Sequence, residues 1–207
     1  MADLAMAHRS PLTGHLRSGR HGRADGAPGV TVSERSDLAA AAITLRAGQQ
    51  EEVARRMQEA FGLALPDRSA CTAAGPLALV WTGPAQWLAL EEGRIGPARF
   101  GFARDLAARL GDASSVTNLT GARAVLRLSG PAVRDALAKL VPIDLDESAF
   151  PSGAAALSLA VHIGVTLWRV PGFADVWDIV CFRSFGESLA HAVLEAAAEF
   201  GCDVLAT

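Results

Sequence analysis

This chain of 207 residues has a single lysine, no tyrosine and no CxxC pair of cysteines. Lys139 is the only lysine, so nearly every cation is an arginine. That bias is typical of a GC-rich genome, and selection for bidentate arginine contacts at an interface is the alternative. Tyrosine is absent and aromatic residues make up only 6% of the chain, so its core must be built mainly from Leu, Val and Ala.

The chain also lacks any excess of positive charge. Its net charge of −3 and its pI near 5.9 argue against nucleic acid as a partner, because phosphate backbones attract basic surfaces. Cys71, Cys181 and Cys202 form no CxxC pair, which indicates reduced thiols. No apolar run approaches the roughly 18 residues of a membrane span, and the N-terminus has no hydrophobic signal core. We therefore expect a soluble, cytoplasmic protein with no membrane contact.

Residues 1–32 contain four arginines and three of the five histidines among Gly, Ser and Pro, without a periodic apolar pattern. This composition predicts an extended N-terminal arm. Such an arm is either disordered or ordered only where a partner covers it.

Residues 33–120 predict a first α+β unit. The pattern indicates strands and helices in the order β-α-β-β-α-β, which is the ferredoxin-like plan of two helices on one antiparallel sheet. The expected elements are a strand at 40–47, a helix at 49–61, a hairpin of 77–81 with 87–90, a helix at 97–110 and a strand at 115–118.

Residues 121–207 predict a second, related α+β unit with its helices on one face of the sheet. A strand at 122–128 turns Ala124, Leu126 and Leu128 to one side. A helix follows Gly130-Pro131, three strands are expected at 155–162, 165–170 and 176–182, and a helix ends the unit. Ser184 and Glu187 have the spacing of a capping box at the start of that last helix.

The search for reactive side chains gives no catalytic, cofactor-binding or metal-binding residue. Neither His162 nor His191 has a metal ligand at zinc-site spacing. His162 is expected to be a hydrogen-bonded core or edge histidine on a strand, and His191 a solvated or interface residue. Gly93-Arg94-Ile95-Gly96 is half of a dinucleotide fingerprint and is better explained as a turn. Ser184 is expected to be a helix cap rather than a nucleophile.

The four tryptophans all lie in expected strands, where large rings are more often core or interface than a ligand cage. They are Trp81, Trp87, Trp168 and Trp177.

The second half of the chain resembles the gamma subunit of heterotetrameric sarcosine oxidase. The resemblance lies in the order and spacing of these segments: 125–131 (VLRLSGP), 134–139 (RDALAK), 143–145 (IDL), 150–153 (FPSG), 167–169 (LWR), 183–185 (RSF) and 199–201 (EFG). Residues 9–12 (RSPL) are similar to the N-terminal arm of that family. Residues 13–110 carry little of the resemblance.

The resemblance implies a subunit of an αβγδ complex that demethylates sarcosine oxidatively to glycine. In that family the alpha and beta subunits hold FAD, FMN, NAD and tetrahydrofolate, the delta subunit holds zinc, and gamma has the folate-binding fold of the glycine-cleavage T-protein without an assigned catalytic role. We therefore expect a structural subunit without a cofactor of its own. The related N-methylglutamate dehydrogenase remains open as the complex, and an independent folate-dependent aminomethyltransferase-like protein is the alternative from another class.

Overall fold

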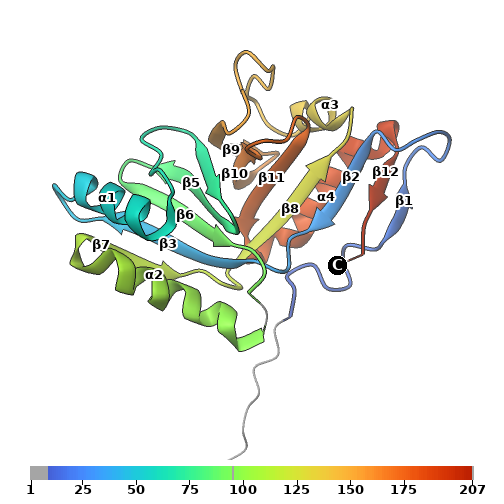
Figure 1. Ribbon diagram of the computed structural model, residues 1–207. Helices are drawn as coiled ribbons and strands as arrows, with labels where there is room; N and C mark the ends of the chain where they lie inside the picture. Colours follow the sequence, from blue (N-terminus) through green and yellow to red (C-terminus); the bar gives the residue numbers. More distant parts are fainter. Residues whose placement is uncertain (1–8, 95, 207) are drawn as a thin grey trace, which may run out of the picture.

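The computed structural model describes residues 9–94 and 96–206, which form two sheets, each with its own helices (Figure 1). The strands are β1 (Gly19–His21), β2 (Val30–Glu34), β3 (Ala39–Leu45), β4 (Cys71–Ala74), β5 (Leu77–Gly83), β6 (Gln86–Glu91), β7 (Ser114–Asn118), β8 (Arg123–Ser129), β9 (Ala155–Ala160), β10 (Ile163–Arg169), β11 (Val176–Phe182) and β12 (Cys202–Val204). The α-helices are α1 (Gln50–Phe61), α2 (Phe102–Leu110), α3 (Val133–Ala138) and α4 (Gly186–Ala197).

The first sheet has the order β4-β5-β6-β3-β7 with antiparallel neighbours throughout. Without β4, this is the ferredoxin-like order that the sequence predicts. Helix α1 buries Val53 and Met57, and it ends at Gly62 with φ 63°, a left-handed conformation that suits glycine. The edge strand β4 is an addition that the sequence did not indicate, because its residues CTAA have little strand propensity.

The second sheet has the order β1-β12-β2-β8-β11-β10-β9. The segment β8-β11-β10 again follows the ferredoxin-like plan, but β2 from the N-terminal region lies between β12 and β8. Strand β2 is antiparallel to β8 and parallel to β12. The predicted α+β class with antiparallel sheets is confirmed, and the β2–β12 pair is a parallel contact within it.

The prediction that the N-terminal region is an extended arm is wrong for residues 9–32; residues 1–8 lie outside the described part. Leu12 is 1% exposed in the core of the second sheet, and β1 pairs with β12. A Cβ atom at Gly22 would overlap the carbonyl oxygen of Ala198, so this segment packs directly on its own chain. The arginine- and glycine-rich composition concealed a short alternation in which Val30 and Val32 are fully buried.

A third apolar cluster joins the two sheets. It contains Leu88 and Leu90 of β6 together with Val125, Trp168 and Val180 of the second sheet. Each sheet therefore has helices on one face, as predicted, and contacts the other sheet with its opposite face, which we call the inner face. Near β9 the sheets are also tied by backbone hydrogen bonds from Cys71 to Gly153 (2.7 Å) and from Ala155 to Ser69 (3.1 Å).

Other boundaries shift by small amounts. The helix expected at 97–110 begins with a 3₁₀ segment at Gly96–Gly101 and becomes α-helical only at Phe102. Helix α3 has six residues, starts at Val133 and buries Val133 and Leu137 fully. The three predicted strands before the last helix are confirmed as β9, β10 and β11.

Candidate functional sites at the junction of the sheets

The two histidines singled out in the sequence lie apart and at the surface. His162 is exposed in the turn between β9 and β10, so the prediction of a hydrogen-bonded strand histidine is wrong. His191 is exposed on α4, with its Nε2 atom 3.3 Å from the Glu195 carboxylate. In the described part of the chain, no group of three or more His, Cys, Asp or Glu is placed to hold a metal ion.

Ser184 does not cap the last helix, which corrects the capping-box prediction. It is exposed within a 3₁₀ segment, Arg183–Phe185, and α4 begins only at Gly186. The N-cap residue is Phe185, which makes no side-chain capping bond. The chain enters this helix tightly because Gly186 lies against Leu12 and Ala124, where a Cβ atom would be 3.0 Å from the Ala124 side chain.

The helix N-termini are poorly suited to a dinucleotide phosphate. Every α-helix has an acidic residue in its first turn: Glu51 and Glu52 in α1, Asp105 in α2, Asp135 in α3 and Glu187 in α4. A carboxylate there occupies the positive end of the helix dipole and repels a phosphate. Gly93 follows β6 with a φ angle of 77°, and Gly96, with φ 57°, begins the 3₁₀ segment; Ile95 of the predicted turn lies outside the described residues.

The three cysteines are free, buried thiols, as the sequence suggested. Burial raises the pKa of Cys71 to about 12, with a further contribution from the Asp178 charge. Burial also raises the pKa of Cys181 and of Cys202 to about 11. Because the thiolate is the nucleophile, thiols with such pKa values are poor nucleophiles at neutral pH.

Trp87, Trp168 and Trp177 are core residues with at most 2% exposure. Trp177 stacks on Phe150 with ring centroids 5.1 Å apart, and the indole N–H of Trp87 donates to the carbonyl oxygen of Pro66 at 2.7 Å. The fourth ring, Trp81, is partly buried against the core of the first sheet. The expectation of core tryptophans is confirmed for the three buried rings.

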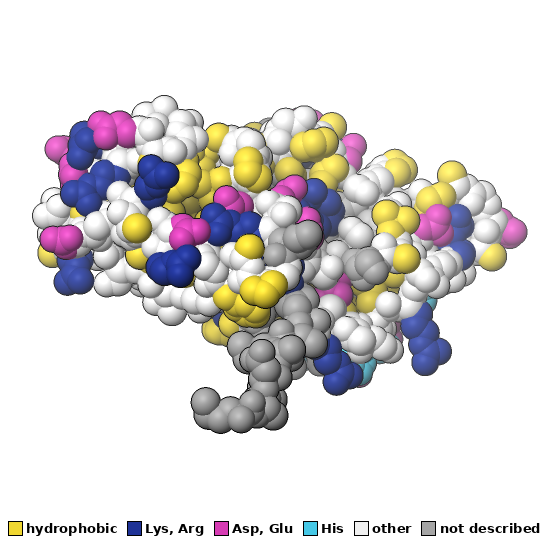
Figure 2. Space-filling view, turned by 60° about the horizontal axis from the view of Figure 1, so that its bottom comes forward, with side chains coloured by type: hydrophobic (Ala, Val, Ile, Leu, Met, Phe, Trp, Pro, Cys, Tyr) yellow, Lys and Arg dark blue, Asp and Glu magenta, His cyan; other side chains and the backbone are white. Residues whose placement is uncertain are grey.

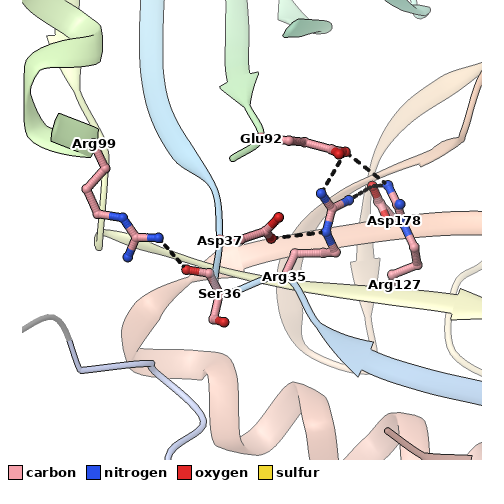
Figure 3. A network of polar contacts seen from close by, with 7 residues as sticks. All are labelled: Arg35, Ser36, Asp37, Glu92, Arg99, Arg127 and Asp178. Carbon is pink, nitrogen blue, oxygen red and sulfur yellow. Dashed lines mark hydrogen bonds and ion pairs between the residues drawn. The ribbon is translucent and has the colours of Figure 1, made fainter. Parts of the chain in front are cut away.

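One end of the inner faces carries a cluster of ion pairs, shown in Figure 3. We call it the ion-pair cluster: Arg35, Asp37, Glu92, Arg127 and Asp178. Arg127 donates two hydrogen bonds to Asp178, both 2.7 Å long, and Asp178 is almost fully buried. Burial lowers the pKa of Arg127, but the hydrogen bonds and charge of Asp178, together with the charges of Glu92 and Asp37, outweigh burial and raise the pKa.

Arg35 links this pair to the first sheet. It follows β2, and its guanidinium lies 2.6 Å from the Glu92 carboxylate just after β6 and 3.5 Å from Asp178 on β11. A weaker contact of 3.4 Å joins it to Asp37. Each carboxylate of the cluster thus contacts an arginine, an arrangement that holds two sheets together and leaves little capacity for proton transfer.

The other end of the inner faces opens into a groove of about 370 Å³. We call it the inter-sheet groove. Among its described lining residues Arg123 alone is charged, and the others include Thr82, Gln86, Leu157, Thr166 and Phe182. The Arg123 guanidinium lies over the Phe182 ring, 4.0 Å from its centroid. This composition suits an apolar group next to an anion more than acid–base chemistry.

The sequence search missed both the ion-pair cluster and the inter-sheet groove. The sequence did contain a signal for the cluster. Asp178 interrupts the apolar run of β11, and Arg127 lies on the face of β8 opposite to Leu126 and Leu128. The register that places Asp178 opposite Arg127 and Phe182 opposite Arg123 is a tertiary feature. It could not be read from either strand alone.

The surface carries no large field of one sign on the side drawn in Figure 2. Basic and acidic side chains lie intermixed there, with hydrophobic side chains between them. Within residues 9–94 and 96–206, no helix is both long and apolar enough to cross a bilayer.

Comparison with known proteins identifies the family. A model described as "Sarcosine oxidase, gamma subunit family" matches residues 47–199. Sarcosine oxidase subunit gamma of Corynebacterium sp. (strain P-1) is 33% identical over 186 residues, which cover 88% of each chain. The Arthrobacter sp. protein of the same name is 34% identical over 150 residues, covering 71% of this chain and 70% of that one.

Solved structures agree with this similarity. A chain of the heterotetrameric sarcosine oxidase from Corynebacterium sp. U-96, in complex with pyrrole 2-carboxylate, matches with a TM-score of 0.76 and 26% identity over 93% of this chain and 96% of that one. Aminomethyltransferase T of the glycine cleavage system from Bartonella henselae matches with a TM-score of 0.54 and 15% identity, covering 94% of this chain but 50% of that one, and so shares the fold. The chain belongs to the sarcosine oxidase gamma subunit family.

Proposed function

We propose that this chain is the gamma subunit of a heterotetrameric sarcosine oxidase and that its role is structural. The observation that carries this proposal is the similarity to a named gamma subunit over 88% of both chains. Its proposed partners are the alpha, beta and delta subunits, and its expected location remains the cytoplasm.

The proposed complex converts sarcosine, tetrahydrofolate and oxygen into glycine, methylene-tetrahydrofolate and hydrogen peroxide. FAD, FMN, NAD, tetrahydrofolate and zinc are assigned to the other subunits. The described residues of this chain support that assignment in two ways. Its helix N-termini carry acids where a dinucleotide phosphate would bind, and burial keeps its thiols protonated at neutral pH.

The structural role is supported by how the chain uses its charges. Arg35, Arg127 and Asp178 are buried or half-buried, and both arginines also contact Glu92, which follows β6 of the first sheet and so links the two sheets. Groups used in this way stabilise a scaffold, whereas a catalytic acid or base needs a proton that can move.

Co-expression of the alpha, beta and delta subunits with and without this chain tests the proposal. We expect the full set to give one complex by size-exclusion chromatography, with oxygen consumption on sarcosine. Omission of this chain should reduce both the yield of complex and the activity. A fully active assembly without this chain would contradict the structural role. Tight binding of tetrahydrofolate by the purified chain would instead favour the folate-dependent aminomethyltransferase-like alternative.

A further inference from the structure

Strand β9 is the outer strand of the second sheet, and part of its free edge is open. Its two ends are already fixed: Ala155 N–H donates to Ser69 O at 3.1 Å, and Val161 N–H donates to Leu140 O at 3.0 Å. Alternate residues of a strand direct their N–H and C=O groups to the same side. Leu157 and Leu159 therefore direct theirs to this edge, away from β10. In the described residues no backbone partner is seen for them on that side.

The same two residues also expose apolar side chains. Leu157 is 50% exposed, Leu159 is 55% exposed, and Val161 next to the strand is 53% exposed. Residues 154–161 (AAALSLAV) include no charged residue and no proline. Proteins usually protect a free edge with lysine, proline, a bulge or a covering segment. An open apolar edge without such protection is typical of a surface that a partner covers.

The inter-sheet groove continues from this edge. In the register of the sheet, Leu157 pairs with Thr166 and Thr166 with Val180, so that the inner face of β9 leads across β10 to β11. Arg123 lies beyond β11 on β8, about 14 Å from β9 because neighbouring strands are about 4.8 Å apart. A strand added outside β9 would lie one spacing farther, about 19 Å from β8, and about six extended residues span that distance.

Arg123 indicates the charge of the missing partner. It is half-buried, burial lowers its pKa, and its neighbour in register is Phe182 rather than an acid. Within the described part of the chain, no carboxylate lies within ion-pair distance of it. A half-buried arginine gains most from a carboxylate, which it can bind in a bidentate manner.

We propose that an extended segment of a neighbouring subunit adds to the open edge of β9, pairs with Leu157 and Leu159, and places a carboxylate on Arg123 across the inter-sheet groove. This inference rests on the proposed function, because it assigns the partner to the same complex. A second copy of this chain fits less well. If two copies paired symmetrically through this groove, each would present Arg123 as its charged lining residue, a like charge instead of a carboxylate.

The test uses the full chain co-purified with the alpha, beta and delta subunits of the same organism. The double substitution Leu157→Lys/Leu159→Lys places charges on the edge, and we expect it to weaken assembly about 30-fold or more. Arg123→Gln should weaken assembly about tenfold or more, and Arg123→Lys should restore part of the loss. Phe173→Lys is the matched control, because Phe173 is 58% exposed on the loop before β11. It should change assembly less than about threefold.

Amide hydrogen exchange distinguishes strand addition from a contact made by side chains alone. The Leu157 and Leu159 amides should exchange quickly in the isolated chain and slowly in the complex. Thermal unfolding of each isolated variant shows whether the substitutions leave the fold intact.

The outcomes show whether the proposed function or only the proposed docking at β9 is wrong. If the wild-type chain does not assemble with the three subunits, the proposed function fails and the docking surface fails with it. If the wild type assembles but the lysine variant assembles equally well, or the two amides stay fast in the complex, only the docking surface is overturned. Concentration-dependent protection of these amides in the isolated chain would identify a second copy as the occupant and would likewise overturn it.

Discussion

The two ends of the inner face of β8 carry the same residue type in opposite situations. Arg127 lies opposite Asp178 and binds it through two hydrogen bonds of 2.7 Å, whereas Arg123 lies opposite Phe182 and stacks on its ring. The two arginines are four residues apart and point to the same face of the sheet. The residue in register on β11 thus decides which end is closed by an ion pair and which end keeps a charge for another molecule.

This difference has an energetic consequence. A buried ion pair gains little over well-packed apolar residues, but removal of one partner is costly because the other charge stays buried. At the cluster end two arginines share Asp178, the one nearly fully buried carboxylate of the cluster, and Arg35 also pairs with the more exposed Glu92. At the groove end, replacing Arg123 by a shorter residue leaves no buried carboxylate without a partner. The two ends should therefore respond very differently to the loss of a charge.

We expect the largest effect from Asp178→Asn at the cluster end. It removes the charge that Arg35 and Arg127 share and should lower the free energy of unfolding by about 3–5 kcal/mol. Urea unfolding of the isolated chain, followed by tryptophan fluorescence, measures this change.

Asp175→Asn is the control for Asp178→Asn. Asp175 precedes the same strand, its side chain is 44% exposed, and its carboxylate is 4.0 Å from Arg134. Such a surface pair contributes about 0–1 kcal/mol. Similar losses for the two variants would mean that the buried Asp178 carboxylate contributes no more to stability than a surface ion pair does.

The N-terminal region allows a second test, because it passes close to both ends. Pro11 borders a small cavity lined also by Arg35 and Arg123, and the neighbouring Leu12 is buried in the core of the second sheet. Leu12→Ala should lower the free energy of unfolding by about 2–4 kcal/mol, through lost burial and the cavity that remains.

For Leu12→Ala the suitable control is Leu205→Ala, since Leu205 is 52% exposed near the other end of the chain. Its substitution should stay within about 0.5 kcal/mol of the wild type in the same denaturation experiment. An equally small effect of Leu12→Ala would restore the interpretation of residues 9–32 as an arm without a place in the core.

Sequence reasoning predicted the elements with long, regular apolar patterns. Helix α1, the β5–β6 hairpin and strands β9 to β11 all have this property, and their predicted bounds agree with the structure to within about three residues. It failed where the structure depends on distant partners. Strands β1, β2 and β12 are three to five residues long and are stabilised by pairing between the two ends of the chain.

The cluster and the groove escaped prediction for a related reason. Asp178 within β11 was a usable signal, since an acid in a buried strand needs a partner. The partner could be any of the arginines until the register was known. The predicted start of α4 was wrong for a different reason. Ser184 and Glu187 have the capping-box spacing, but the preceding 3₁₀ turn moves the helix start to Gly186.

The smallest expected effect concerns two thiols, one near each end of the inner face. Burial, with help from the Asp178 charge, raises the pKa of Cys71 to about 12, whereas burial raises the pKa of Cys181 to about 11 and the Arg123 charge opposes it. At pH 9 the thiolate fraction should therefore be higher at Cys181 than at Cys71. Alkylation of the native chain with iodoacetamide, followed by mass spectrometry, should show this order, and both thiols should react more slowly than in urea.

Arg123→Gln should slow the alkylation of Cys181 and leave that of Cys71 unchanged, because only Cys181 loses a nearby positive charge. Equal slowing at both cysteines would indicate a general change in opening of the fold, and the electrostatic contrast between the two ends would then be refuted.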